Sequence, residues 1–480
     1  MYILVLESST TNAKAMLYDT VQKTFAVASK AYEFNNIKEA CLHDADYVFA
    51  ATVELGRKLS QGKKIDAIAL GTTWHNIMLC DKEMRPQTPV YQWTYTGASE
   101  LCKKLREDKD YTLRYYQKTG CMVNITYIFF TLKLLRQNGW ALENYKITGQ
   151  GAYNTYKLTG EWVAPDVLVS GNGMLNTHKR DYDDELLKEL GINRENLAEL
   201  VTFKQSYPLS AEGAELLGLT PGIPVIPAMP DGALNQVGSG ALADGIMTFS
   251  VGTSAAIRLS SPKPIIPEKP STWCYLSPLA WICGAATAGS CNCVDWAKER
   301  LFGNDTSYRA IEDGIKNIAH NDEPVVFLPF LFGERCPGWE DGRSGGFFNI
   351  KPQHTAYDMY NSVLEGVLFN IYHCYTILTE VGQPPQRIKL SGGILRSPAW
   401  LQMCVDIFNV PMEADPAEHG SLMGGVVLAM EKLGLIGSLL EMEFPAGQII
   451  KPNPENTAIY RERFKRYLYW YDRTNPAKNL

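Results

Sequence analysis

The chain lacks the features that point to nucleic acid, a membrane or secretion. It has 46 Lys and Arg against 52 Asp and Glu, a formal net charge of −6, so no basic excess is available to neutralise the phosphates of a nucleic acid or an anionic membrane. No apolar run reaches the length of about 18 residues that a spanning helix needs. The N-terminus, MYILVLESST, has neither a basic region nor the long apolar core of a signal peptide. We therefore expect a cytoplasmic protein with no nucleic-acid or membrane partner.

Cysteine is present but not in a pattern that predicts bridges or zinc. There are 11 cysteines, an odd number, and no CxxC pair. The closest two, Cys291 and Cys293, are separated by a single residue. Buried, reduced thiols are the interpretation that this scatter favours over a disulfide framework or a zinc site.

The length and one internal repeat indicate two related domains. A chain of 480 residues with 45% apolar and 20% charged residues is globular and too long for one hydrophobic core. The apolar run 3–6, a hydroxyl-rich turn over 8–12 and a second strand at 14–18 form a predicted hairpin. The same design recurs at 246–251, 252–254 and 255–258, and a basic residue follows each turn, Lys14 and Arg258. We place the domain boundary near residue 240.

The remaining pattern predicts an α/β fold with mixed sheets, because strands alternate with amphipathic helices. Further strands are expected at 65–70, 224–228, 324–328 and 388–390. Helices are expected at about 38–60, 97–107, 184–190, 292–302, 355–380, 398–408 and 421–434. The basic, aromatic stretch 461–471 is most simply a helix docked on the protein.

The two turns are candidate phosphate sites. Successive backbone N–H groups in a tight turn converge on an anion, and hydroxyls add donors. Gly252 would let the backbone approach a phosphate closely. Either turn alone is better interpreted as an ordinary hairpin, but a matched pair, one in each half, favours phosphate binding. No GxxxxGK[ST] motif occurs, so an ATP site must be of another kind.

Asp231 is the candidate catalytic carboxylate. It follows the apolar segment 224–230 directly and precedes a predicted helix, and ligands of α/β sheets bind at that edge of the sheet. Its alternative role is a simple helix N-cap. A second strand runs into a glycine turn at Leu390-Ser391-Gly392-Gly393, followed by Ser397, which suits a nucleotide base or ribose. The GxGxxA match at 238–243 is rejected because it follows a predicted helix, not a strand.

Taken together, these segments resemble the FGGY carbohydrate kinases of the actin-type ATPase superfamily over essentially the whole chain. The specific pieces are the Asp231 segment with its GTS turn, FLPFLFGERCP at 327–337, LEGV at 364–367, and SGGILRS at 391–397 with Trp400 and Gln402. The region 273–302 and the GERxP segment look most like the gluconate kinase branch, close to the xylulose kinases.

The resemblance implies two ribonuclease H-like domains, 1–240 and 241–480, with a deep cleft between them. The first would hold the sugar and one phosphate loop, and the second would hold ATP. Asp231 matches the family's general base, which accepts the proton of a sugar hydroxyl. The other implied roles are phosphate and nucleotide binding by Ser9, Thr10, Thr11, Lys14, Gly252, Thr253, Ser254, Gly392, Gly393 and Ser397, sugar binding by Trp74, His75, Trp93 and Asp231, and Mg²⁺ held through water by Glu7 and Asp231.

The chain departs from the family pattern in three places. Glu7 and Ser9 stand where the first motif has Asp and Gly, and the W-x-D-x-R sugar motif reads Trp93-Thr94-Tyr95-Thr96-Gly97. Ser290-Cys291 replaces a glycine pair in the nucleotide-facing loop. A lone histidine such as His75 is often structural, and the departures leave the specificity open.

The sequence thus predicts an ATP-dependent kinase of a small sugar or sugar acid, gluconate-like or ketopentose-like. It would use ATP and Mg²⁺, and a homodimer remains open. The alternatives are a catalytically weakened relative that binds sugar or nucleotide as a regulator, which Glu7, Tyr95 and Gly97 favour, and an actin-like ATPase of another kind, which the FGGY-specific segments disfavour.

Overall fold

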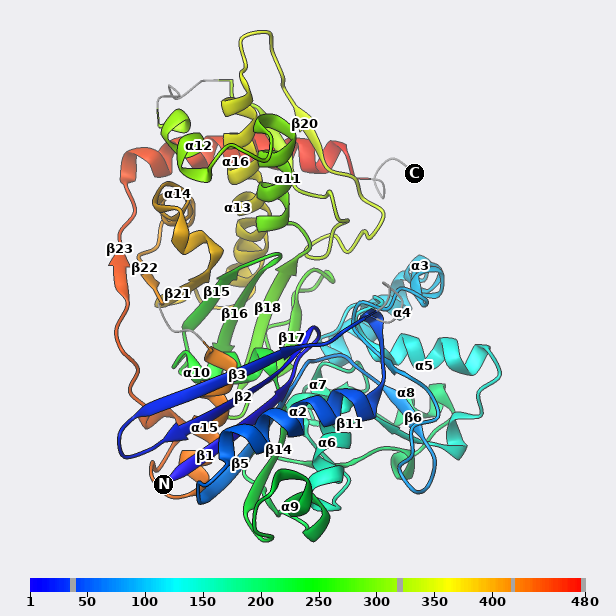
Figure 1. Ribbon diagram of the computed structural model, residues 1–480. Coiled ribbons are helices and arrows are strands. Elements are labelled where there is room, and N and C mark those ends of the chain that lie inside the picture. The colour runs from blue at the N-terminus through cyan, green and yellow to red at the C-terminus, as the bar shows by residue number, and fades with distance from the viewer. Residues whose placement is uncertain (35–39, 317–322, 416–418, 476–480) are drawn as a thin grey trace.

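The computed structural model describes residues 1–480 except 35–39, 317–322, 416–418 and 476–480. It contains two large mixed sheets, one from each half of the chain, stacked as two domains (Figure 1). Part of the helix expected at 38–60 falls on the undescribed residues. Among the helices of the described residues, none has the length and apolar character needed to cross a membrane.

The first sheet has six strands in the order β13-β14-β5-β1-β2-β3. Strand β1 is antiparallel to β2 and parallel to β5, which is parallel to β14. The strands are β1 (Tyr2–Ser8), β2 (Asn12–Asp19), β3 (Thr24–Ala31), β5 (Ile65–Thr72), β13 (Tyr207–Pro208) and β14 (Pro224–Pro230). Both faces of β1 are buried, which explains its uninterrupted apolar run.

The second sheet repeats this topology in seven strands, β17-β18-β16-β15-β21-β22-β23. Here β15 is antiparallel to β16 and parallel to β21, which is parallel to β22. The strands are β15 (Ile246–Val251), β16 (Ala255–Ser261), β17 (Trp273–Leu276), β18 (Trp281–Thr287), β21 (Arg387–Gly392), β22 (Met412–Ala414) and β23 (Gln448–Ile450). The repeat read from the two hydroxyl-rich hairpins is therefore a repeat of whole sheets.

The helices cover the sheets and fill the space around them. In the first half they are α2 (Ala45–Ser60), α3 (Ser99–Glu107), α4 (Lys109–Thr119), α5 (Ile128–Gln137), α6 (Gln150–Thr159), α7 (Asp166–Ser170), α8 (Asp184–Leu190), α9 (Ala211–Leu217) and α10 (Asp231–Gly238). In the second half they are α11 (Cys291–Phe302), α12 (Tyr308–Ile315), α13 (Ala356–Val381), α14 (Pro398–Phe408), α15 (Gly420–Lys432) and α16 (Pro454–Arg473).

Short strands and 3₁₀ turns complete the described structure. The strands are β4 (Leu42–His43), β6 (Met78–Cys80), β7 (Val90–Tyr91), β8 (Lys146–Thr148), β9 (Val163–Pro165), β10 (Leu175–Asn176), β11 (Asp181–Tyr182), β12 (Glu199–Val201), β19 (Val326–Leu328) and β20 (Gly346–Phe348). The 3₁₀ turns are Leu142–Asn144, Arg194–Asn196, Gly393–Arg396 and Leu439–Glu441.

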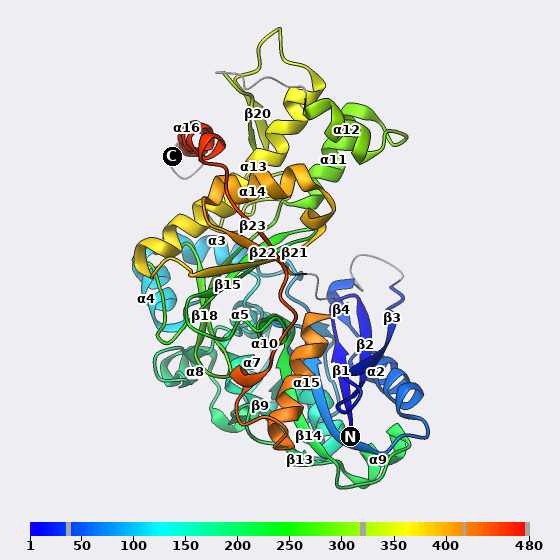
Figure 2. The ribbon, with the colours of Figure 1, turned by 90° about the vertical axis from the view of Figure 1, so that its left-hand side faces the viewer.

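Two helices cross between the domains, and each packs on the other domain's sheet. Helix α15 comes from the second half yet lies beside β1 and β5 in both views (Figures 1 and 2). A Cβ on Gly425 would lie 2.6 Å from the Val5 side chain. Helix α10 follows β14 but reaches the second sheet, where Thr248 on β15 donates a hydrogen bond to Gln236 at 2.7 Å. The crossing is close, because a Cβ on Gly424 would lie 2.0 Å from the Leu234 carbonyl oxygen.

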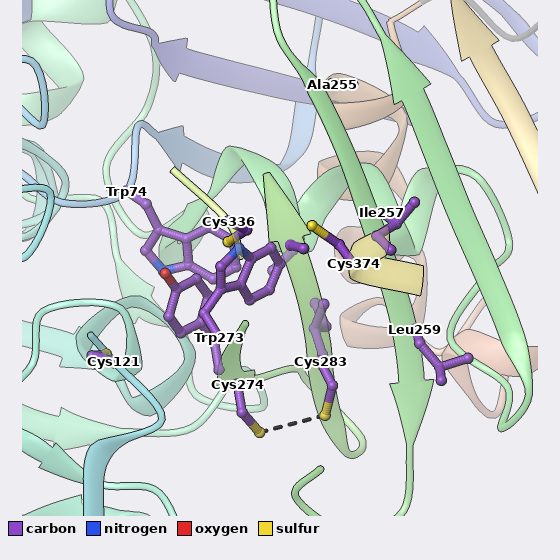
Figure 3. Close-up of a cluster of buried hydrophobic side chains, with 14 of the residues drawn as sticks. Trp74, Cys121, Ala255, Ile257, Leu259, Trp273, Cys274, Cys283, Cys336 and Cys374 are labelled. Atoms are coloured by element: carbon purple, nitrogen blue, oxygen red, sulfur yellow. Dashed lines mark hydrogen bonds between the residues drawn. The ribbon is translucent and has the colours of Figure 1, made fainter. Parts of the chain in front are cut away.

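The cysteines are free thiols in the described structure, and nine of the 11 are buried. Cys291 and Cys293 lie on a helix and not on a strand. They lie in the first turn of α11, where the Asn292 side chain accepts hydrogen bonds from the backbone N–H groups of Ser290 and Cys293 at 2.7 and 2.8 Å. Behind the interdomain region, Cys274 and Cys283 pair across β17 and β18 with their sulfur atoms 3.4 Å apart (Figure 3).

Candidate active site

One cavity of about 280 Å³ lies between the two domains. The first domain contributes Thr10, Thr73, Trp74, His75, Trp93, Asp231 and Gly232, and the second contributes Ser254, Ala256, Arg258, Trp273, Tyr275, Ala286 and Arg335. Residues from both hydroxyl-rich turns therefore reach the cavity that holds Asp231. A polar cavity between two domains of an α/β protein is a natural site for a small ligand.

Asp231 stands at the carboxyl end of β14 and is the first residue of α10. Its Oδ1 accepts a hydrogen bond from the adjacent Gly232 N–H at 2.7 Å, and the N-cap position is held by Pro230 without a side-chain bond. The simple capping role is therefore not observed. Burial is the larger cause and the negative charge of Glu7 the smaller cause that raise the pKa of Asp231 to about 6. A carboxylate with this pKa is ionised at neutral pH yet basic enough to take a proton.

The first turn is organised by Glu7, which is fully buried. Its Oε1 accepts hydrogen bonds from Ser9 at 2.5 Å and from Lys14 Nζ at 2.8 Å. Its Oε2 is buried and has no partner among the described residues. The longer arm of Glu7 fits because its strand neighbour on β5 is Gly71, whose missing Cβ would lie 3.1 Å from the Glu7 Cγ. Ser9 and Glu7, both departures from the family pattern, are thus one hydrogen-bonded unit.

Thr10 joins the first turn to the cavity wall. Its hydroxyl accepts a hydrogen bond from Trp93 Nε1 at 3.1 Å and lies 3.3 Å from the Thr73 hydroxyl. Thr11 is exposed on the same turn. These contacts place the indole of Trp93 against the first turn, where it forms part of the cavity wall.

The second turn, 252–254, is open to a ligand. A Cβ on Gly252 would meet no atom closer than 3.8 Å, and both Thr253 and Ser254 are exposed. The turn is held from behind, since the backbone N–H of Cys291 donates to the Gly252 carbonyl at 3.0 Å. The segment Ser290-Cys291, which replaces the family's glycine pair, therefore holds the second turn in place through this hydrogen bond. The sequence did not reveal this role.

The third glycine turn follows β21 next to the second turn. Gly392 has φ +95°, and a Cβ there would lie 2.3 Å from the Val251 carbonyl oxygen, so only glycine fits. A Cβ on Gly393 would lie 3.0 Å from the Cys291 sulfur. Ser397 caps α14 by accepting a hydrogen bond from the Trp400 N–H at 3.2 Å. Contact of these residues with a nucleotide stays a prediction.

His75 has a defined tautomer. Its Nδ1 lies 2.5 Å from the Gly171 carbonyl oxygen, which can only accept, so Nδ1 carries the proton. Burial lowers the pKa of His75 to about 3, so the ring is neutral at physiological pH. Its Nε2 is then an acceptor for a ligand hydroxyl. The neighbouring Trp74 donates its indole N–H to the Val167 carbonyl at 3.2 Å and presents an aromatic face to the cavity.

Several cavity residues were not identified from the sequence as site residues. Arg258 was noted only as the basic residue after the second turn, and Arg335 only as part of GERxP. Counted from the first paired residue after the turn, Lys14 is one residue along its strand and Arg258 is three residues along. This greater distance from the turn places Arg258 in the cavity wall. The signal for it was its place within an apolar strand. Trp273 and Tyr275, stacked at 4.4 Å, complete the wall.

The two lost residues of the sugar motif do not line the cavity in their new form. A Cβ on Gly97 would lie 2.1 Å from the Tyr95 hydroxyl. The Tyr95 side chain thus occupies the space that a side chain at 97 would need, and its ring contacts Tyr91 at 4.9 Å. The two departures depend on each other.

In this two-domain α/β fold, two hydroxyl-rich turns and a basic carboxylate face one interdomain cavity, an arrangement typical of phosphotransferases. Comparison with known proteins makes this specific. Residues 2–238 match the N-terminal domain, and residues 247–432 the C-terminal domain, of the FGGY family of carbohydrate kinases. The chain belongs to this family.

Individual relatives agree over nearly the full length. A gluconokinase of Bacillus subtilis is 26% identical over 94% of this chain and 92% of its own. The crystal structure of gluconate kinase from Lactobacillus acidophilus superposes with a TM-score of 0.94 at 27% identity, covering 98% of this chain and 97% of the other. The ligand-bound xylulose kinase from the same organism gives 0.92 at 26% identity, covering 98% of each.

These comparisons confirm the predicted fold of two ribonuclease H-like domains and the carbohydrate kinase class, which uses ATP. They also confirm the expected branch, since the relatives are gluconate and xylulose kinases. The alternative of a weakened regulator finds no support among them.

Proposed function

We propose that this kinase transfers the γ-phosphoryl group of ATP to a hydroxyl of a small sugar acid or ketopentose, with Asp231 as the general base. The observation that carries the proposal is the convergence of Asp231, Thr10 and Ser254 on one interdomain cavity. Phosphoryl transfer needs donors around the phosphates and a carboxylate near the attacking hydroxyl, and this cavity has both. The substrates named for the relatives support the two acceptor classes.

The chain's own residues divide the work as follows. Asp231, ionised above about pH 6, takes the proton of the attacking hydroxyl as that oxygen bonds to phosphorus and the bond to the ADP oxygen breaks. His75 Nε2 accepts from another hydroxyl of the acceptor and fixes its orientation. The backbone N–H groups of Thr10 and Thr11 face the turn of Thr253 and Ser254 across the phosphates, while the hydroxyl and N–H of Ser9 hold the first turn together by donating to Glu7 and to the Asn12 carbonyl.

The residues at the first turn fit a divalent cation. No group of three or more His, Cys, Asp or Glu that could hold a metal occurs among the described residues, but Mg²⁺ in such enzymes is bound by one or two carboxylates, water and phosphate. The partnerless Oε2 of Glu7 meets this requirement, together with Asp231. When bound, Mg²⁺ would neutralise charge on the phosphates. Lys14, which is ion-paired with Glu7, would add a second cation.

A coupled assay of ADP release tests the proposal. Purified protein is given ATP and Mg²⁺ with pentuloses, aldoses, alditols and aldonates, and the Asp231→Asn variant serves as the control. We expect at least one sugar acid or ketopentose to support turnover in the parent alone. Turnover by the variant at the parent's rate would remove Asp231 from the role of base.

A further inference from the structure

Two arginines face the cavity without a carboxylate partner. Both Arg258 and Arg335 line it, and neither forms an ion pair within 4 Å with any acidic residue in the described part of the chain. By contrast, the other interior arginines near the second domain's core, Arg343 and Arg463, are each paired with a glutamate. Partly buried guanidinium groups are normally paired, so these two arginines call for a negatively charged group on a bound ligand.

Arg258 is held in place by its strand. Its neighbours Ile257 and Leu259 on β16 are buried, and Leu259 is paired with the buried Cys283 of β18 (Figure 3). Arg258 therefore points to the opposite face of the sheet, which lines the cavity. One guanidinium nitrogen donates to the Ser250 hydroxyl at 3.3 Å. A Cβ on Gly232 would lie 3.5 Å from Arg258 Nε, which places the guanidinium beside the residue that follows Asp231.

Arg335 is held by anchored neighbours on both sides. Before it, Glu334 accepts hydrogen bonds from Arg343 at 2.8 Å and from the Tyr471 hydroxyl at 2.6 Å. After it, the Cys336 N–H donates to the Ala286 carbonyl at 3.1 Å. The guanidinium lies over the Trp93 ring, 5.7 Å from its centre, and its Nε is buried without a hydrogen-bond partner. Arg335 is thus a fixed donor with a free hydrogen-bonding position.

The cavity carries a net positive charge. Its wall contains two arginines and one carboxylate, Asp231, while His75 is neutral. The adjacent Lys14 and Glu7 neutralise each other. Among the side chains of the wall one cation has no counter-charge, and one carboxylate on the acceptor would balance it. Planar guanidinium forks match carboxylates in geometry as well as charge.

Building on the proposed kinase function, we propose that the acceptor is a sugar acid whose carboxylate is bound by Arg258 and Arg335. The hydroxyl at Asp231 then belongs to another part of the same molecule, and the carboxylate fixes which hydroxyl reaches the base. This selects the aldonate class over the ketopentoses. The lost arginine and aspartate of the usual sugar motif, now Gly97 and Tyr95, are replaced by a cationic recognition site built from the second domain.

Three acceptors of the same chain length isolate the carboxylate: D-gluconate, D-gluconamide and D-sorbitol. They share a hydroxylated chain and differ at C1 in charge. We expect kcat/KM for the acid to exceed that of the amide and the alditol by about 10- to 100-fold, the range expected for a charge-assisted hydrogen-bonded pair. Equal or higher kcat/KM for the neutral acceptors overturns the proposal.

Variants assign the effect to the arginines. In Arg335→Gln and Arg258→Gln, KM for the acid should rise by about 10-fold or more and the preference over the amide should vanish, whereas Arg335→Lys should retain part of it. The exposed Arg57→Gln on α2 is the control and should behave as the parent. A fall in kcat that is equal for all acceptors, with KM unchanged, would mean that the arginines act on the transferred phosphoryl group and would refute carboxylate binding.

Calorimetric titration with D-gluconate separates this proposal from the kinase function. Turnover with neutral acceptors but no binding of the acid leaves the kinase function standing and refutes the carboxylate site. Binding of the acid that is lost in Arg335→Gln, with no ADP release from any acceptor, supports the site and refutes the kinase function. The substrate comparison uses the unmodified protein, so misfolding of a variant does not remove the test.

Discussion

Replacing Asp231 with asparagine should abolish turnover and make the folded protein more stable at neutral pH. Both effects follow from removing one buried carboxylate, which is the proposed base and whose pKa is raised. Asparagine keeps the oxygen that accepts from the Gly232 N–H and removes only the charge. Loss of a general base lowers kcat by roughly 10²- to 10⁴-fold.

The stability gain follows from proton linkage. Burial and Glu7 raise the pKa of Asp231 from 3.8 to about 6 in the folded state. Between these values the folded protein holds a proton that the unfolded chain has lost, so stability falls as pH rises. Below about pH 4 the group is protonated in both states and costs nothing. Above about pH 6 the full penalty applies, about 3 kcal/mol for a shift of roughly two units.

Thermal unfolding of parent and Asp231→Asn from pH 4 to pH 8 checks this sign. The two midpoints should converge near pH 4 and separate in favour of the variant by pH 7. Asp81→Asn is the control of opposite sign, because hydrogen bonds from the Arg85 backbone lower the pKa of Asp81, and this variant should gain no stability at neutral pH. If Asp231→Asn unfolds at the parent's temperature at pH 8, the burial argument for the raised pKa is wrong. The parent's kcat/KM should also fall below about pH 6.

Three other substitutions test separate parts of the site and the fold. Glu7→Gln removes the charge that raises the Asp231 pKa, so the acid limb of the pH–rate profile should move to lower pH; an unmoved limb contradicts the coupling. In His75→Asn the asparagine suits the positive φ of 57°, but the Nε2 acceptor is lost. KM for the sugar should therefore rise about fivefold. Steady-state kinetics should show the same increase at every pH from 6 to 9. Gly424→Ala should destabilise by about 1–3 kcal/mol although alanine favours helices, while Gly342→Ala, with no atom within 4 Å, should leave the melting temperature unchanged.

The parts of the site that could be predicted from the sequence are those formed by residues adjacent in the chain. The hairpin turn 252–254 and the position of Asp231 after β14 follow from short apolar runs and the residues that end them. The expected segments 224–228 and 388–390 are β14 and β21, each slightly longer than expected. The expected strand 324–328 is shorter, because pairing with β20 begins only at Val326.

Features that join distant segments could not be predicted in this way. Arg258 and Arg335 line the same cavity because β16 and the GERxP segment both face it. No local sequence pattern encodes this arrangement. The position of α15 on the first domain's sheet is another case. Its apolar periodicity predicts a buried helix but not which sheet buries it, and that partner is fixed by the close contact of Gly425 with Val5.

The departures at Glu7, Ser9, Tyr95 and Gly97 are matched by each other or by their neighbours, which argues that the site has been rebuilt rather than eroded. Glu7 is accommodated by Gly71 and hydrogen-bonded by Ser9. A site losing function by drift would accumulate unmatched changes, such as a charge without a counter-ion or a side chain without space. The cavity arginines, Arg258 and Arg335, form no ion pair among the described residues, and they lie where the acceptor would bind. The excess positive charge is therefore best explained as half of an interaction that a negatively charged substrate completes.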